Sequence, residues 1–292
     1  MRLALAVIIV ALGVASMAAA NSNELPALAY AADAGGSLDV YILPSGAAAP
    51  RLLTTTRLDE FSPSWSPDGR FIAYRVNPQR SDVGDIWVMR ADGRSKRNLT
   101  RTPRVAEWSP AWSPNGRRIA YFSSDGEDVW VMRTDGTRRR NLTRRAGLDE
   151  YPSWSLDGRR LAFGSHRDGQ FEIYAMRADG SRQINLTRSP THDQWPAWSP
   201  DGRSIAFMSE RDGSPDVFVM DADGSSPRNL TRTAVLEESH PAWLPDGRLT
   251  FTRHGETGPI EVWSAERDGR GAERLDLAVE PVFVFAWRRP IP

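Results

Sequence analysis

Phe61-Ser-Pro-Ser-Trp-Ser-Pro-Asp-Gly-Arg70 is the stretch that decides the fold, because close copies of it return along the whole chain. A tryptophan near the middle of each copy marks the repeat, and successive tryptophans lie 42 to 47 residues apart. A fixed period in this range is typical of repeat architectures. The aligned tryptophans are Trp65, Trp112, Trp154, Trp198, Trp243 and Trp287.

Length and composition agree with one closed array of repeats. The chain has 292 residues, of which 40% are hydrophobic and 25% charged, so it should fold. The 37 basic and 37 acidic residues balance, which argues against a nucleic-acid partner held by net positive charge. The absence of cysteine excludes disulfides, thiolate metal sites and a cysteine nucleophile.

The N-terminus has the features of a secretory signal peptide. A short basic start, Met1-Arg2, precedes an apolar run from Leu3 to Met17 and the small residues Ala18-Ala-Ala20. The alternative is an uncleaved membrane anchor, but the apolar run is short for a bilayer span. We therefore expect residues 1–20 to be a signal peptide, no membrane span after its removal, and a periplasmic or secreted protein.

Each repeat divides into four short strands, here called a, b, c and d in chain order. In the second unit we expect them at Phe61–Trp65, Phe71–Tyr74, Asp85–Met89 and Arg97–Thr100. A Ser-Pro-Asp-Gly turn joins a to b, and an Asp-Gly turn joins c to d. Proline presets φ in such turns, and glycine accepts a positive φ. No segment after the leader keeps a helical period.

The two ends of the chain complement each other. The first unit supplies strands b, c and d at Leu28–Ala31, Leu38–Leu43 and Arg51–Thr54, and Glu280–Trp287 reads as a lone strand a. We therefore predict an all-β six-bladed propeller of four-stranded antiparallel blades, in which the C-terminal strand completes the first blade. Closure leaves only short, protected edges. An open solenoid is the alternative, but it would not need complementary ends.

The repeat resembles those of the TolB-type β-propeller family. The resemblance rests on Pro-x-Trp-Ser-Pro-Asp-Gly-Arg, Asp-Ile-Trp-Val-Met and Arg-Asn-Leu-Thr, and it covers residues 27–288. It implies a periplasmic protein of the Tol–Pal envelope system. The family pattern also has an N-terminal α/β domain, whereas about seven residues separate the predicted cleavage site from the first blade. We expect a propeller-only relative over residues 21–292, which acts as a monomeric scaffold for a protein or peptide of the cell envelope.

A ring of carboxylates is predicted at one end of the propeller. Each complete repeat has an acidic residue five positions before its tryptophan. Strand a lies innermost, and the d–a and b–c connections share one end of the ring. These acids should therefore crowd the channel mouth at that end and attract a basic peptide or a cation. The structural alternative is that each acid caps its turn or pairs with the arginine that ends strand d. The acids are Glu60, Glu107, Asp149, Asp193 and Glu238, and the arginines are Arg101, Arg144, Arg188 and Arg232.

Aromatic residues and a histidine follow these acids. We predict that they give a partner contact area inside the charged rim. The longest b–c connection of the central blades, Arg75–Gly84, is expected to add specificity on the same face. The aligned tryptophans are expected to pack between blades. The predicted contact residues are Trp108, Tyr151, Trp195 and His240.

An enzyme is the alternative function. Metal-dependent lyases of pectin fragments use a related propeller with several channel histidines, which suggests a metal-assisted carbohydrate lyase or hydrolase with a divalent cation in the channel. The four histidines here lie in different repeats, and only His240 falls on a strand a. No Gly-x-Ser-x-Gly, phosphate-loop or zincin sequence is present. We therefore expect a non-catalytic protein without a cofactor.

Two other repeated features have structural interpretations. Asn-Leu-Thr would be a glycosylation sequon in a eukaryotic secreted protein, but here it is one strand d copied four times. Asp221-Ala-Asp-Gly224 resembles half a calcium loop, but the other repeats have an ordinary c–d turn there. The end of each blade that holds the a–b and c–d turns, here called the turn face, is thus predicted to be structural.

Overall fold

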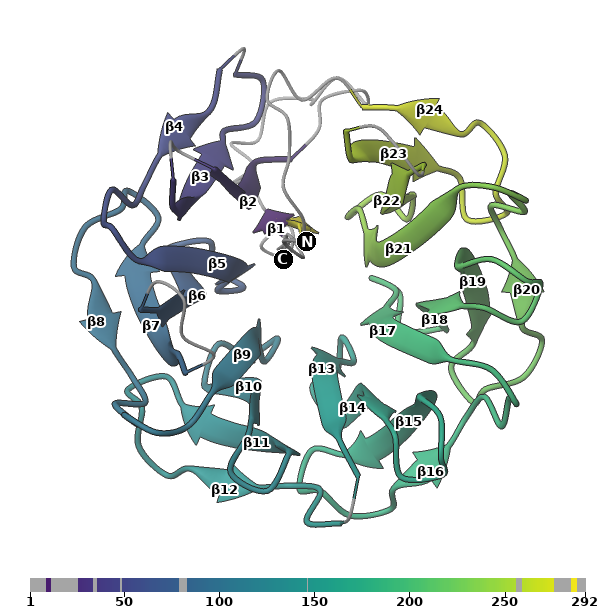
Figure 1. The fold of residues 1–292 in the computed structure, drawn as a ribbon, viewed down its shortest axis with the longest axis horizontal. Helices are drawn as coiled ribbons and strands as arrows, with labels where there is room; N and C mark the ends of the chain where they lie inside the picture. Colours follow the sequence, from purple (N-terminus) through teal and green to yellow (C-terminus); the bar gives the residue numbers. More distant parts are fainter. Residues whose placement is uncertain are drawn as a thin grey trace.

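The computed structural model describes residues 9–11, 26–33, 36–47, 49–78, 83–145, 147–255, 259–275 and 285–287. Within these residues the chain forms six β-sheets that radiate from a central axis like the blades of a propeller (Figure 1). In blades 2 to 6 strand a lies innermost and strand d outermost. The predicted all-β, six-bladed architecture is confirmed.

The strands follow chain order from blade to blade. Blade 1 contains β25 (Phe285–Trp287), β2 (Leu28–Asp33), β3 (Leu38–Leu43) and β4 (Arg51–Leu52). Blade 2 contains β5 (Asp59–Trp65), β6 (Phe71–Asn77), β7 (Asp85–Arg90) and β8 (Arg97–Asn98). Blade 3 contains β9 (Glu107–Trp112), β10 (Arg118–Ser123), β11 (Asp128–Arg133) and β12 (Arg140–Asn141). Blade 4 contains β13 (Asp149–Trp154), β14 (Arg160–Ser165), β15 (Glu172–Arg177) and β16 (Ile184–Asn185). Blade 5 contains β17 (Asp193–Trp198), β18 (Ser204–Ser209), β19 (Asp216–Asp221) and β20 (Arg228–Asn229). Blade 6 contains β21 (Glu237–Trp243), β22 (Leu249–His254), β23 (Glu261–Ala265) and β24 (Glu273–Arg274).

Blade 1 combines strands from both ends of the chain. β25 pairs antiparallel with β2, so that Leu28 lies opposite Trp287. A short strand, β1 (Ile9–Ala11), runs parallel to β25 on its other side. The rest of the predicted signal peptide and the first part of the Glu280–Trp287 segment lie outside the described residues. No helix among the described residues is long and apolar enough to cross a membrane.

The core lies between the blades rather than inside any one of them. Four hydrophobic clusters each contain side chains of two adjacent blades, from blades 2 and 3 to blades 5 and 6. Three of the aligned tryptophans add a hydrogen bond across a blade junction, because their indole N–H groups donate to carbonyls of the preceding blade. Trp112 donates to Ser64 at 3.0 Å and Trp154 to Ala111 at 3.1 Å, and Trp243 makes the same bond to blade 5. The tryptophans therefore pack between blades, as predicted.

The repeated Asn-Leu-Thr sequence supports the loop-rich end of each blade. In blade 2, Asn98 Nδ2 and Thr100 Oγ1 donate to the carboxylate of Asp85 at 2.8 and 3.0 Å. Asn98 Oδ1 in turn accepts from the backbone N–H groups of Thr100 and Arg101. Blades 3 and 5 repeat the same contacts. A half-buried or buried acid at the start of strand c is thus satisfied by strand d, as buried polar groups require.

Candidate binding site at the channel mouth

Every innermost strand from blade 2 to blade 6 has a β-bulge three residues before its tryptophan. In blade 4, Glu150 lies opposite Gly164 and Ser153 opposite Ala162, so two residues face one on the neighbouring strand. The second of the two is always a proline, which has no N–H for the ladder. The first has a left-handed backbone, which is costly without glycine and re-aims the side chain. The bulge residues are Ser62, Ser109, Tyr151, Trp195 and His240, with φ from 49° to 54°.

The bulge residues of blades 4, 5 and 6 stack on one another. The rings of Tyr151 and Trp195 meet edge to face with centroids 5.8 Å apart. The rings of Trp195 and His240 lie 3.9 Å apart at 32°. All three side chains remain partly exposed. Because blades 2 and 3 have Ser62 and Ser109 at this position, the three rings cover one side of the innermost ring of strands. We call Tyr151, Trp195 and His240 the aromatic arc.

Trp108 belongs to a different cluster. It lies one residue before the bulge of blade 3, whereas the arc residues are themselves at the bulge. Its ring stacks on Phe122 with centroids 3.9 Å apart, and the guanidinium of Arg75 lies 5.4 Å from its centroid. Arg75 also covers Phe61, at 4.6 Å. The sequence placed Trp108 beside the arc residues, but no ring contact among the described residues joins it to them.

The five predicted acids are all buried, with at most 2% of their surface exposed. In blades 4, 5 and 6 each forms an ion pair with an arginine from the end of strand b or the b–c connection. These arginines also lie over aromatic rings of their own blade. The sequence had suggested that the acids pair instead with the arginines that end strand d. All four of those arginines are exposed. The pairs are Asp149–Arg167 at 2.7 Å, Asp193–Arg211 at 2.9 Å and Glu238–Arg253 at 2.7 Å.

Blades 2 and 3 bury an acid without such an arginine. No described residue forms an ion pair with Glu60 or Glu107, and Thr56 donates a hydrogen bond to Glu60 at 2.6 Å. Burial raises the pKa of both carboxyls to about 7, against the lowering effect of nearby threonines. The ring of acids therefore divides into two uncompensated members and three that are paired.

The groups around the arc are close to neutral at pH 7. Burial raises the pKa of Glu150 to about 8, although a hydrogen bond with Trp108 lowers it. Burial, and next the charge of His254, lower the pKa of His240 to about 3. Sequence reasoning missed Glu150. One signal could have found it, because it is the only ionisable residue at its repeat position, where the other blades have Phe61, Trp108, Gln194 and Ser239.

The b–c connection of blade 2 is shorter than predicted. β6 continues to Asn77, so Arg75 and Asn77 lie in strand b and are buried. Residues 79–82 of this connection, including Gln79 and Arg80, lie outside the described residues. Within the part of the chain that the structure describes, no group of three or more His, Cys, Asp or Glu side chains is arranged to hold a metal ion.

Six radial sheets that pack side by side around an axis define a β-propeller, and comparisons with known proteins show to which family it belongs. The model of the TolB beta propeller domain matches residues 82–279, and the chain belongs to this family. The predicted family is thus confirmed. A structure of TolB from Acinetobacter baumannii is similar over 86% of this chain and 65% of its own length, with a TM-score of 0.73 and 22% identity.

Other known proteins are similar to a smaller extent. The Tol-Pal system protein TolB of Francisella tularensis is 30% identical over 79 residues, which is 27% of this chain and only 18% of that protein. An oligogalacturonate lyase from Vibrio parahaemolyticus has a TM-score of 0.58 at 12% identity, covering 87% of this chain and 73% of its own. At such identity the likeness concerns the fold alone.

Proposed function

We propose that this chain is an exported, non-catalytic scaffold that binds a protein or peptide of the cell envelope at the channel mouth. The observation that carries the proposal is the aromatic arc. Three stacked, partly exposed rings are held on strained bulges of rigid inner strands. Aromatic side chains of this kind lose little entropy on binding and are the usual anchors of protein interfaces.

The surroundings of the arc favour an apolar anchor rather than a strongly cationic ligand. The five acids of the mouth are buried and three are paired, so they support the loops instead of forming an open anionic funnel. We assign the direct contacts to Tyr151, Trp195 and His240. Trp108, supported from below by the buried Arg75, would contact the same ligand from the other side of the ring.

The relatives support the envelope part of the proposal. The matched curated relatives are named as Tol-Pal system proteins, and this chain shares their propeller family. Export follows from the predicted signal peptide at residues 1–20. A periplasmic location would give a monomeric scaffold access to envelope proteins.

A capture experiment tests the site. The mature chain is immobilised and incubated with an envelope extract, and bound proteins are identified by mass spectrometry and then purified. Wild type and a Trp195→Ala/His240→Ala double variant are compared with a Trp130→Ala control, which removes a partly buried aromatic from strand c of blade 3. We expect the double variant to lose the partner that wild type and control retain. Equal capture by all three would place binding elsewhere, and no reproducible partner would contradict the scaffold.

The alternative function, a metal-assisted carbohydrate lyase or hydrolase, makes a separate prediction. Such an enzyme would purify with a stoichiometric divalent cation and would cleave uronide polymers. Elemental analysis of the purified protein and an assay on such polymers distinguish it from the scaffold. Metal-dependent cleavage would overturn the non-catalytic proposal.

A further inference from the structure

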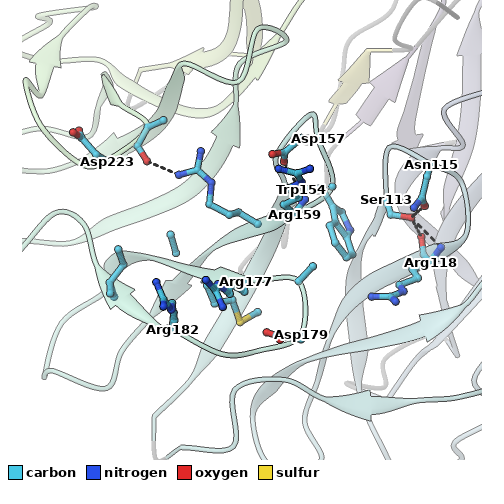
Figure 2. Close-up of a pocket in the computed structure, with 17 residues that line it drawn as sticks. Ser113, Asn115, Arg118, Trp154, Asp157, Arg159, Arg177, Asp179, Arg182 and Asp223 are labelled. Carbon is cyan, nitrogen blue, oxygen red and sulfur yellow. Dashed lines mark hydrogen bonds between the residues drawn. The ribbon is translucent and has the colours of Figure 1, made fainter.

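A groove opens on the turn face, which is the end of the propeller opposite the channel mouth. Figure 2 shows the side chains that line it. It has a volume of about 870 Å³ and is lined by blades 3, 4 and 5. The buried side chains of Trp154 and Met176 give it an apolar base. The a–b turns of blades 3 and 4 and the c–d turns of blades 4 and 5 form its rim. The sequence had predicted that this end of each blade is only structural.

The lining is basic. It contains five arginines and three aspartates, a net charge of +2. The aspartates are engaged in their own turns, because each accepts a hydrogen bond of 2.6 Å from the serine two positions away. Four of the arginines form no ion pair and donate no side-chain hydrogen bond to any described residue, so their guanidinium groups are available to a ligand. These four are Arg118, Arg159, Arg177 and Arg182, which Figure 2 shows around the groove.

The other repeats show what is unusual about blade 4. Strand d begins with an arginine in blades 1, 2, 3 and 5 and with Glu273 in blade 6. In three of these blades the arginine reaches the next blade; Arg97, for example, donates to the carbonyl of Thr134 at 3.2 Å. Blades 1 and 5 make the same bond. In blade 4 the position is Ile184, which lines the groove and is 54% exposed. The carbonyl of Ala222, which an arginine there would reach, accepts from Arg160 at 3.3 Å instead.

This exchange leaves an apolar side chain where the repeat would have placed a cation. Arg160 is fixed in its substitute role, because its guanidinium also lies 4.5 Å from the ring centroid of Trp198. The hydrogen bond between blades 4 and 5 is therefore still made, and the side chain of Ile184 takes no part in it. A single exposed isoleucine is ordinary. An isoleucine that borders a basic groove with an apolar base forms a surface suited to a specific ligand.

We propose that the turn-face groove binds an acidic peptide segment of a partner protein, with one apolar side chain of the segment packed against Ile184. The carboxylates of the segment would meet Arg118, Arg159, Arg177 and Arg182, whose planar forks suit carboxylate groups. This site is separate from the channel mouth and does not depend on the function proposed there.

A peptide fits the groove better than a nucleic acid does. Phosphates at every nucleotide would gain nothing from Ile184 and would be repelled by Asp157, Asp179 and Asp223 of the lining. A peptide can place carboxylates and an apolar side chain where the groove offers cations and an isoleucine. The whole chain carries 37 charges of each sign, so its net charge does not attract anions in general. An acidic ligand is therefore attracted only by the basic lining of this groove.

Fluorescence anisotropy with labelled synthetic peptides tests the proposal. The probe is a short peptide of Asp and Glu around one Leu. The comparison probes replace Leu by Gly, or all acids by their amides, and a single-stranded DNA oligonucleotide serves as the competing anion. We expect wild type to bind the acidic Leu probe at least about tenfold more tightly than either peptide control, a difference of about 1.4 kcal/mol.

Three variants connect binding to the groove. Ile184→Arg introduces the residue that blades 1, 2, 3 and 5 have at this position, so we expect normal thermal unfolding and about a tenfold loss of affinity. Ile184→Ser, which only removes the apolar contact, should lose affinity too. Arg182→Glu should abolish binding. Arg138→Glu is the matched control, because Arg138 occupies the same position of the c–d turn in blade 3, has the same φ of 54° and lies outside the groove lining. It should bind like wild type.

Several results would overturn the proposal. They are absence of binding to wild type, equal loss with Arg138→Glu and Arg182→Glu, and unchanged binding in both Ile184 variants. Full competition by the oligonucleotide at matched charge would show general anion binding instead. Trp195→Ala should leave probe binding unchanged, so that failure of the groove and failure of the channel-mouth proposal can be told apart.

Discussion

The two ends of the propeller handle charge in opposite ways. At the channel mouth, acids are buried and matched to arginines or left with a raised pKa, and the partly exposed groups are aromatic. On the turn face, carboxylates are held within turns, and arginines point into a groove with no partner among the described residues. The first arrangement stabilises loops around an apolar contact. The second leaves cations free to bind.

The comparison teaches where to look for function in a repeat protein. Positions that keep one residue type in most blades serve the fold on both faces, such as the turn aspartates and the buried acids. Positions that change in one or a few blades stand at the candidate sites. His240 and Trp195 replace serines of blades 2 and 3, and Ile184 replaces an arginine. The repeats act as internal controls for one another.

The largest effect is expected from breaking a buried pair at the channel mouth. Arg167→Ala leaves the fully buried Asp149 without its cation, which should lower the free energy of unfolding by about 3–5 kcal/mol. Urea denaturation measures this loss. The turn-face variant Arg177→Ala is the matched control and should change stability by less than about 0.5 kcal/mol. Similar losses of stability in both variants would contradict the conclusion that arginines stabilise the fold at the channel mouth but not on the turn face.

The uncompensated acid of blade 3 predicts a pH dependence. Burial raises the pKa of Glu107 from 4.5 to about 7, so the folded state keeps a proton that the unfolded chain has already released. Unfolding free energy should therefore fall as pH rises from 4.5 to 7, and stay reduced above that.

Glu107→Gln removes the titrating group and should stabilise the protein at pH 8 by up to about 3 kcal/mol, with little effect at pH 4. Thermal unfolding at the two pH values tests this, with the exposed Glu266→Gln as the control. A variant that is equally stable relative to wild type at both pH values would show that Glu107 is not held protonated.

The arc should account for binding at the mouth without supporting the fold. Trp195→Ala removes the middle ring of the arc. We expect it to weaken the binding of the captured envelope partner by at least about 2 kcal/mol, roughly thirtyfold in Kd. Isothermal titration with the purified partner gives the affinity. Binding of the acidic probe to the turn face should stay within twofold of wild type, and a parallel loss there would indicate that the variant is misfolded.

The smallest effect is expected at a turn carboxylate. Asp157 accepts hydrogen bonds from the Ser155 hydroxyl and the Arg159 N–H, so Asp157→Ala should cost about 1 kcal/mol of stability. The same change removes a negative charge from the groove and should tighten binding of the acidic probe about twofold. Weaker probe binding in a folded variant would mean that Asp157 orders the groove rather than opposing the ligand.

The sequence was sufficient for the fold because the repeat encodes it redundantly. The spacing of Trp65, Trp112 and its counterparts gave the number of blades, and the turn residues gave the strand order. The side-chain directions of strand a were harder to predict. A bulge at each Pro shifts the register by one residue, and such a shift sends the following side chains to the other face. Trp108 was therefore grouped with the arc although it lies before the bulge.

Long-range contacts explain the remaining gaps. Asp149 is paired with Arg167 and Asp193 with Arg211, each across 18 residues. Blades 2 and 3 lack a corresponding pair, so the pattern holds in too few blades to be recognised as a rule of the repeat. The groove depends on Arg160 and Ala222, which are 62 residues apart, and no local pattern connects them. Ile184 was visible in the sequence as an exception to Arg-Asn-Leu-Thr. Only the structure showed that its side chain is exposed at the edge of a basic groove, where it can contact a ligand.

The tryptophan hydrogen bonds across blade junctions have an evolutionary consequence. Trp112 gives a hydrogen bond to the blade before it, and Ala111 beside it receives one from the blade after it. A gene segment that encodes a repeat like that of blade 3 therefore carries the donor of one junction and the acceptor of the next. Copying such a segment adds a blade whose two borders already match its neighbours. The ring could grow by duplication without inventing a new interface, until the blades filled the circle.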